Sequence, residues 1–218
     1  MSNLHADPCV LVIFGASGDL TRRKLLPTIY NLAEDGLLPE EFTVLGVARP
    51  PIDESAFRAE MRETVHDAEG EPLEADKWKR IEDRLYYLSG EFDTPATFDA
   101  LKNKLQEIRD RHHTPANYLF YFAIPPDLFG MVADGLATAG LAREDEGWRR
   151  LIIEKPFGYD VDTARALNAD LTKGFRESQI YRIDHYLGRK RSRIFSPSGS
   201  PTASSSRCGT GATSTTCR

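Results

Sequence analysis

Six short runs of apolar residues, separated by segments with helical spacing, recur along this chain of 218 residues. The runs are rich in β-branched and aromatic side chains, which is typical of strands that are buried on both faces of a sheet. We expect strands at residues 9–14, 43–48, 85–88, 118–124, 150–154 and 180–183. Strands that alternate with helices form a parallel, doubly wound sheet, so the pattern predicts a Rossmann-like α/β fold.

Helices are expected between these strands. Apolar side chains recur at helical spacing from Leu25 to Leu32, and Gly36 is a suitable residue to end that helix. We expect further helices at residues 56–65, 98–108, 128–139 and 161–171. In such folds a ligand binds beyond the carboxyl ends of the strands, so polar residues that follow the strands are the candidates for a site.

The charge distribution separates residues 1–188 from residues 189–218. The whole chain has a formal net charge of −5, but residues 189–218 contain six basic side chains and no acidic one. The other 22 basic and 33 acidic residues give residues 1–188 a net charge of −11, which argues against nucleic acid as a partner. Residues 189–218 also contain eight serines and five threonines, a composition that predicts disorder.

Several classes of protein are disfavoured by simple patterns. No apolar run approaches the ~20 residues that span a bilayer, and residues 1–8 lack the features of a secretory signal. Only Cys9 lies outside residues 189–218, so no disulfide is expected within the folded part. We therefore expect a cytoplasmic protein with no membrane partner and no metal.

A glycine-bearing turn, Gly15-Ala16-Ser17-Gly18-Asp19-Leu20, joins the first strand to the first helix. Glycines let the backbone approach a phosphate closely, and a helix N-terminus offers unpaired N–H groups and a positive dipole end. The spacing is G-x-x-G rather than G-x-G-x-x-G, so a plain strand-to-helix turn is the alternative. The position after the first strand favours phosphate binding.

Basic residues follow the second and fifth strands. An arginine at the end of the second strand accommodates the 2′-phosphate of NADP, where NAD-binding proteins have an acid, so Arg49 indicates NADP. Lys155, in Glu154-Lys155-Pro156-Phe157-Gly158, is placed to contact a sugar hydroxyl or a nicotinamide, and its bond to Pro156 is a candidate for the cis form. The alternatives are a solvated Arg49 and a surface Lys155.

An acid, an imidazole and a phenol follow the sixth strand as Asp184, His185 and Tyr186. Neighbouring residues of an extended segment point in opposite directions, so we expect Asp184 and His185 to serve different partners rather than to form a dyad. A structural histidine is the alternative for His185.

Three motifs in this order, GASGDL, EKPFG and RIDHYLG, resemble the glucose-6-phosphate dehydrogenase family from about Val10 to Gly188. That family oxidises glucose 6-phosphate to a lactone and passes the hydride to NADP. The resemblance implies that Arg49 holds the 2′-phosphate of the coenzyme and that Lys155 lies between coenzyme and sugar. It implies that the coenzyme diphosphate is bound by Gly15, Ala16, Ser17, Gly18, Asp19, Leu20, Thr21 and Arg22.

The same resemblance implies roles after the sixth strand. His185 and Tyr186 would bind the substrate phosphate, and Asp184 would orient a catalytic histidine that takes the proton from the C1 hydroxyl. That histidine lies well downstream in the family, in a second α+β domain that also forms the oligomer interface, and these 218 residues do not include it. Arg189 stands where the family has a substrate-binding lysine. We thus expect an N-terminal tail (1–8), an NADP-binding domain (9–178), the start of a second domain (179–188) and a tail (189–218).

Residues 189–218 are explained by a shift of reading frame. The family sequence continues approximately as LGKETVQNIFAF, and deletion of one A from a plausible AAGG at codon 189 yields Gly-Arg-Lys-Arg-Ser-Arg-Ile-Phe-Ser-Pro-Ser-Gly, which is the sequence of residues 188–199. We therefore interpret Arg189 as an altered lysine codon. Resequencing of the locus tests this hypothesis, and an unbroken frame without a recoverable downstream motif would contradict it.

These observations predict an NADP-dependent glucose-6-phosphate dehydrogenase by ancestry, in a truncated and inactive copy. A non-catalytic module that binds NADP, or that pairs with an intact enzyme, is the alternative. An oxidoreductase of another Rossmann family with its own short substrate domain is disfavoured by the EKPFG and RIDHYLG pair.

Overall fold

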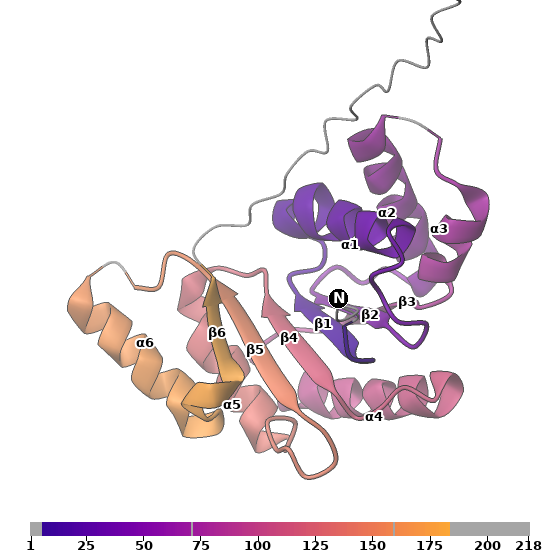
Figure 1. The fold of residues 1–218 in the computed structure, drawn as a ribbon. Coiled ribbons are helices and arrows are strands. Elements are labelled where there is room, and N and C mark those ends of the chain that lie inside the picture. Colours follow the sequence, from indigo (N-terminus) through magenta and orange to yellow (C-terminus); the bar gives the residue numbers. More distant parts are fainter. Residues whose placement is uncertain (1–5, 71, 159, 184–218) are drawn as a thin grey trace, which may run out of the picture. The chain divides into compact units, whose positions relative to one another are not determined.

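The apolar runs form one six-stranded sheet in the computed structural model, which describes residues 6–70, 72–158 and 160–183. Its order is β3-β2-β1-β4-β5-β6, and each pair of neighbours is parallel (Figure 1). All carboxyl ends of the strands therefore lie at one edge of the sheet. The strands are β1 (Val10–Phe14), β2 (Thr43–Ala48), β3 (Leu85–Ser89), β4 (Tyr118–Phe122), β5 (Arg149–Glu154) and β6 (Ile180–Ile183).

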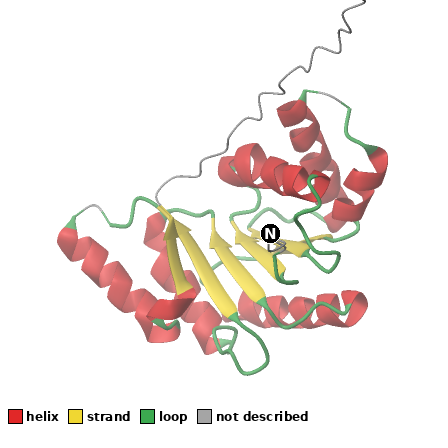
Figure 2. Cartoon of the chain, viewed as in Figure 1, coloured by secondary structure: helices red, strands yellow, loops and turns green. Residues whose placement is uncertain are grey.

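Helices connect successive strands (Figure 2). The α-helices are α1 (Leu26–Glu34), α2 (Glu54–Glu69), α3 (Ala75–Glu82), α4 (Pro95–His112), α5 (Phe129–Thr138) and α6 (Val161–Gly174). The shorter turns are η1 (Thr21–Leu25), which is π-helical, and the 3-10 turns η2 (Pro126–Leu128) and η3 (Glu177–Gln179).

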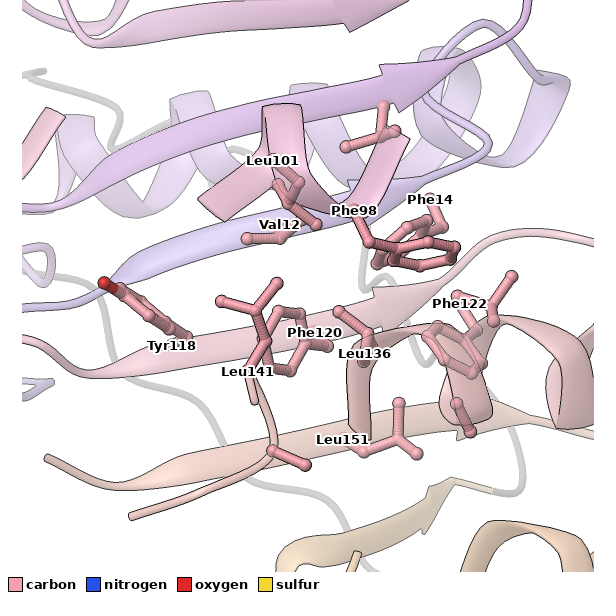
Figure 3. Packing of buried hydrophobic residues seen from close by; sticks show 14 of the residues in the cluster. Val12, Phe14, Phe98, Leu101, Tyr118, Phe120, Phe122, Leu136, Leu141 and Leu151 are labelled. Atoms are coloured by element: carbon pink, nitrogen blue, oxygen red, sulfur yellow. The ribbon is translucent and has the colours of Figure 1, made fainter. Parts of the chain in front are cut away.

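Two apolar clusters, one on each face, hold the layers together. On one face α1, α2 and α3 cover the strands with residues such as Ile29, Phe57 and Trp78. On the other face α4, α5 and α6 contribute Leu101, Leu136 and other side chains to a cluster that includes residues of every strand (Figure 3). Because residues of β1 are buried in both clusters, β1 has apolar side chains at every position.

An aromatic group joins this core to the carboxyl edge of the sheet. Phe14, the last residue of β1, makes edge-to-face contacts with Phe92 and Phe122, with ring centroids 5.7 Å and 5.5 Å apart. Such pairs contribute about 0.5–1.5 kcal/mol each beyond the burial of their area. The group therefore fixes the residue that immediately precedes the glycine-bearing turn.

The predicted fold class is confirmed, with differences in detail. The fourth strand ends at Phe122 rather than at residue 124. The helix α2 begins earlier than predicted, because Asp53 caps its N-terminus by accepting a hydrogen bond from the Ala56 N–H at 2.7 Å, and it continues to Glu69. The prediction omitted α3, which buries only Trp78 and Ile81. None of the described helices is long and apolar enough to cross a membrane.

The proposed domain boundary is only partly within the described residues. β6 pairs with β5 from Ile180 to Ile183, so these residues are part of the six-stranded sheet. The second domain that we expect to begin at residue 179 stays a prediction, and the tail from residue 189 lies outside the described residues.

Candidate functional site

A pocket of about 340 Å³ lies at the carboxyl edge of the sheet, and we call it the strand-end pocket. Ligand pockets commonly measure about 300–1,000 Å³, so this one is large enough to hold part of a nucleotide. The pocket is lined by Gly15, Ser17, Gly18, Ala48, Arg49, Glu91, Phe92, Asp93, Ala123, Ile124, Pro125, Leu128 and Met131. The predicted residues of the glycine turn and Arg49 therefore meet in one place.

The turn after β1 requires glycine at position 15. Gly15 has a φ of +88°, which L-residues with a side chain rarely adopt, and a Cβ there would lie 2.2 Å from the main-chain oxygen of Ala123. The Gly15 N–H donates to the Val47 oxygen at 2.8 Å. Its own oxygen accepts from the Gly18 N–H at 2.9 Å and from the Thr21 hydroxyl at 3.2 Å. These bonds fold the chain tightly between β1 and the helix.

The geometry of this turn fits a phosphate group. The chain is helical from Asp19 onward, so the first N–H groups of the helix have no acceptor one turn earlier. The Ser17 N–H also has no hydrogen-bond partner in the part of the chain that the structure describes. Gly18 has no side chain that could block the backbone from the pocket. A Cβ added there would lie 3.1 Å from the Gly15 oxygen.

Other residues of the predicted motif have structural positions. Ala16 and Thr21 are fully buried and Leu20 is half-buried, so these three would reach a ligand through their backbone rather than their side chains. Asp19 is exposed, and its carboxylate lies 3.9 Å from the Arg23 guanidinium. Their roles as coenzyme ligands stay predictions.

Arg22 has a partner that the sequence did not reveal. Its guanidinium forms an ion pair with Glu60, which belongs to α2. One nitrogen, Nε, is buried without a hydrogen-bond partner among the described residues. The predicted contact of Arg22 with a diphosphate would therefore compete with this ion pair, and it stays a prediction.

Arg49 follows β2 directly, and β3 holds its backbone. The Ser89 hydroxyl donates to the Arg49 oxygen at 3.2 Å, and the Tyr87 hydroxyl donates to the Pro50 oxygen at 2.7 Å. The Arg49 side chain is exposed and makes no hydrogen bond or ion pair within the described ranges. Its fixed backbone and unpaired guanidinium suit it to bind an anion in the pocket.

Lys155 follows β5 and is exposed at the same edge of the sheet. The Lys155–Pro156 peptide bond is cis, as the sequence suggested. Glu154, the preceding residue, accepts a hydrogen bond from the Tyr121 hydroxyl of β4. Lys155 is not among the described residues that line the strand-end pocket, which come from the segments at the ends of β1, β2, β3 and β4. It follows β5, the neighbour of β4 in the sheet.

Four predicted residues, Asp184, His185, Tyr186 and Arg189, lie outside the described residues. The roles that we expect for them stay predictions. Cys9, by contrast, is described and buried, and burial raises the pKa of its thiol to about 12. A thiol of this kind is a structural apolar side chain rather than a nucleophile.

Sequence reasoning missed one wall of the pocket. Glu91, Phe92 and Asp93 come from the loop after β3, and Leu128 and Met131 come from the start of the α5 region. The rule that ligands bind at the carboxyl ends of strands could have identified the loop after β3, because it follows a predicted strand. No motif in the sequence marks that loop as part of a site.

Comparisons with known proteins identify a family. The model of the domain described as "Glucose-6-phosphate dehydrogenase, NAD binding domain" matches residues 12–192. Glucose-6-phosphate 1-dehydrogenase of Aggregatibacter actinomycetemcomitans is 46% identical over 190 residues, which are 86% of this chain and 37% of that protein. The enzyme of Bacillus subtilis is 40% identical over 184 residues, or 83% of this chain and 36% of that protein. The chain thus spans little more than a third of these relatives.

Comparison with solved structures identifies the same family. A glucose-6-phosphate dehydrogenase in complex with its substrate glucose-6-phosphate superposes with a TM-score of 0.75 at 30% identity, over 87% of this chain and 39% of that one. The glucose-6-phosphate 1-dehydrogenase of Mycobacterium avium gives a TM-score of 0.69 at 32% identity, over 81% of this chain and 36% of that one.

Proposed function

The chain belongs to the glucose-6-phosphate dehydrogenase family, and from this premise we propose that it binds NADP in the strand-end pocket. The observation that carries the proposal is that the unpaired guanidinium of Arg49 lines the same pocket as Gly15 and Gly18. A dinucleotide with a 2′-phosphate needs two anion sites at the carboxyl edge of a sheet, and this pocket has a glycine turn and an arginine there.

The turn would hold the diphosphate through backbone groups. The Ser17 N–H and the first N–H groups of the helix donate to phosphate oxygens, and the positive end of the helix dipole adds to this attraction. The buried side chains of Ala16 and Thr21 keep the turn rigid. When bound, NADP would supply the nicotinamide that accepts a hydride from the sugar.

Preference for NADP over NAD depends on Arg49. Glu91 and Asp93 line the same pocket and oppose an anion there, so the preference requires direct, bidentate contact between the guanidinium and the 2′-phosphate. Replacement of Arg49 by alanine should weaken NADP binding by about 100-fold and NAD binding by less than about threefold.

Isothermal titration calorimetry of the purified chain with NADP and with NAD measures both changes. Arg143→Ala is a matched control, because Arg143 is an exposed arginine that does not line the pocket. Equal losses for NADP and NAD in the Arg49→Ala variant would show that Arg49 does not read the 2′-phosphate. Unchanged binding of both would place the coenzyme elsewhere.

The reaction follows from the family and is part of the same proposal. The substrate would be glucose 6-phosphate, with Lys155 near the sugar and with His185 and Tyr186 on its phosphate. Asp184 would orient a histidine that is not among these 218 residues, so we propose that this polypeptide alone does not form NADPH. Absorbance at 340 nm with glucose 6-phosphate and NADP tests this, and turnover near that of an intact relative would refute it.

The alternative, a non-catalytic NADP-binding module, shares the binding step and differs in its partner. Co-purification with an intact paralogue would favour it. Under either function we propose a cytoplasmic setting, because the free thiol of Cys9 fits a reducing compartment.

A further inference from the structure

A second cavity, of about 440 Å³, lies toward the opposite end of the sheet, and we call it the lower cavity. Val44, near the start of β2, lines it, whereas Ala48, at the end of β2, lines the strand-end pocket. Because a strand rises about 3.3 Å per residue, these two residues are roughly 13 Å apart along β2. The lower cavity is therefore separate from the proposed coenzyme site, and its volume suits a small ligand.

One side of the lower cavity is apolar. Ile29 of α1, Val44 of β2 and Ile81 of α3 are buried core residues that line it. Leu38 and Phe42, from the segment between α1 and β2, are half-buried and pack against the same cluster. This wall would remove the apolar part of a ligand from water.

The other side of the lower cavity carries an excess of one positive charge. Three basic residues, Lys77, Arg80 and Arg84, face two acidic ones, Glu40 and Asp83. The ammonium group of Lys77 is already paired, with Glu74 at 2.9 Å and Glu34 at 3.9 Å. Asp83 accepts a hydrogen bond from Lys79. The remaining cations are thus the guanidinium groups of Arg80 and Arg84.

Of these two arginines, Arg80 is exposed and Arg84 is half-buried. The Nη1 atom of Arg84 is buried, and its guanidinium makes no hydrogen bond or ion pair within the ranges that the structure describes. His112, which also lines the cavity, does not compete for an anion as a cation, because burial and the nearby Arg84 and Arg111 lower its pKa. The Nη1 atom has almost no accessible surface, so an oxyanion in the cavity would bind the other donors of this half-buried guanidinium, Nε and Nη2.

We propose that the lower cavity binds a small organic monoanion, with its carboxylate on Arg84 and its apolar body against Ile29 and Ile81. A carboxylate matches the guanidinium fork, and its single charge matches the net charge of the lining. A phosphate ester carries about −1.5 to −2 charge at pH 7, and Glu40 and Asp83 would oppose the excess. The ligand class is therefore an aromatic or branched carboxylate.

Phenylacetate is the probe, and ligand-observed NMR with the full chain is the measurement. We expect saturable binding of phenylacetate, with binding of 2-phenylethanol and of phenyl phosphate at least about tenfold weaker. The alcohol has the same ring without the charge, and the phosphate has the ring with a larger charge. Addition of NADP should leave phenylacetate bound, because the two sites are separate.

Variants assign the site. Arg84→Met keeps an apolar stem and removes the charge, and it should weaken phenylacetate binding by about tenfold or more. Arg143→Met removes an exposed arginine that lines neither cavity and should change nothing. Ala33→Met narrows the cavity while it leaves Arg84 in place, so it should also weaken phenylacetate binding. Circular dichroism verifies the fold of each variant.

Three results would overturn the proposal. One is the lack of saturable phenylacetate binding to the wild-type chain. Another is equal binding to the Arg84→Met, Ala33→Met and wild-type chains, which would place the probe elsewhere. The third is equal binding of phenylacetate and 2-phenylethanol, which would show that the cavity recognises the ring without the charge.

Discussion

Replacement of Gly15 by alanine tests the geometry of the glycine turn most directly. Gly15 has a φ of +88°, and an added Cβ would lie 2.2 Å from the Ala123 oxygen and 2.9 Å from the Ala123 carbon. Cβ atoms do not approach other heavy atoms closer than 3.0 Å, so Ala123 would have to move by roughly 1 Å. Ala123 is held in place, because its N–H donates to the Phe14 oxygen at 2.9 Å.

The size of the effect follows from three contributions. A left-handed conformation costs an alanine about 1–2 kcal/mol, and the stiffer unfolded chain returns about 0.4–1 kcal/mol. Relief of the overlap with a hydrogen-bonded main-chain carbonyl adds about 1–3 kcal/mol, as overpacking of a core does. Gly15→Ala should therefore lower the free energy of unfolding by about 3 kcal/mol and the Tm by about 6–12 °C.

Gly36→Ala is the matched control. Gly36 has a similar φ of +67°, but an added Cβ there would meet nothing within 4 Å. Only the conformational contributions remain, so the loss should be about 0.5–1 kcal/mol. The difference between the two variants isolates the contact with Ala123.

Urea unfolding followed by far-UV circular dichroism measures both variants against the wild-type chain. Equal losses for Gly15→Ala and Gly36→Ala would refute the reasoning, because the close approach of Ala123 would then have no cost. A Gly15→Ala variant as stable as the wild-type chain would contradict the conformation of the turn itself.

Three further predictions concern residues outside the two cavities. Asp160 caps α6 by accepting a hydrogen bond from the Thr163 N–H, and this bond lowers the pKa of Asp160 below 3.8. Asp160→Ala should therefore lower the Tm at pH 7. This difference should shrink as the pH falls below 3.8 toward the depressed pKa of the folded state, and a pH-independent gap in calorimetry would contradict it. In a Cys208→Ser/Cys217→Ser double variant, Cys9 should react with a disulfide reagent at pH 8 only after urea is added; rapid reaction without urea would refute its burial. Arg149 is buried and donates to main-chain oxygens that include that of Leu141 at 3.2 Å. Arg149→Met should therefore lower the free energy of unfolding in urea by about 3 kcal/mol, and a negligible loss would show that these carbonyls find other donors.

Much of the fold could be predicted because the sheet has a strong local signal. Each strand is a short apolar run, and the carboxyl ends of parallel strands must share one edge. That rule identified Gly15 and Arg49 as candidates at one edge of the sheet, and both line the strand-end pocket. The helix α3 gave too weak a signal, since two buried residues, Trp78 and Ile81, do not make a visible helical period.

The rest of the site depends on packing that the local sequence does not encode. The ion pair between Arg22 and Glu60 requires that η1 lies against α2, which is a property of how the helices pack. The charge of the lower cavity likewise depends on pairing between side chains, because Lys77 pairs with Glu74 and Asp83 with Lys79, which leaves Arg80 and Arg84 as its cations. Neither arrangement has a motif, and each required the positions of side chains from different elements.

The proximity of Gly15 and Arg49 is set by backbone hydrogen bonds rather than by side-chain contacts. The Val47 oxygen accepts from both the Gly15 N–H, at 2.8 Å, and the Ala16 N–H, at 3.3 Å, so β2 fixes the start of the turn. Arg49 comes two residues after Val47, directly after the end of the same strand. The distance between the proposed diphosphate turn and the proposed 2′-phosphate ligand is therefore determined by the register of β1 on β2. Any sequence that keeps this register, a glycine at position 15 and an arginine after β2 therefore keeps both proposed anion sites in the same relation.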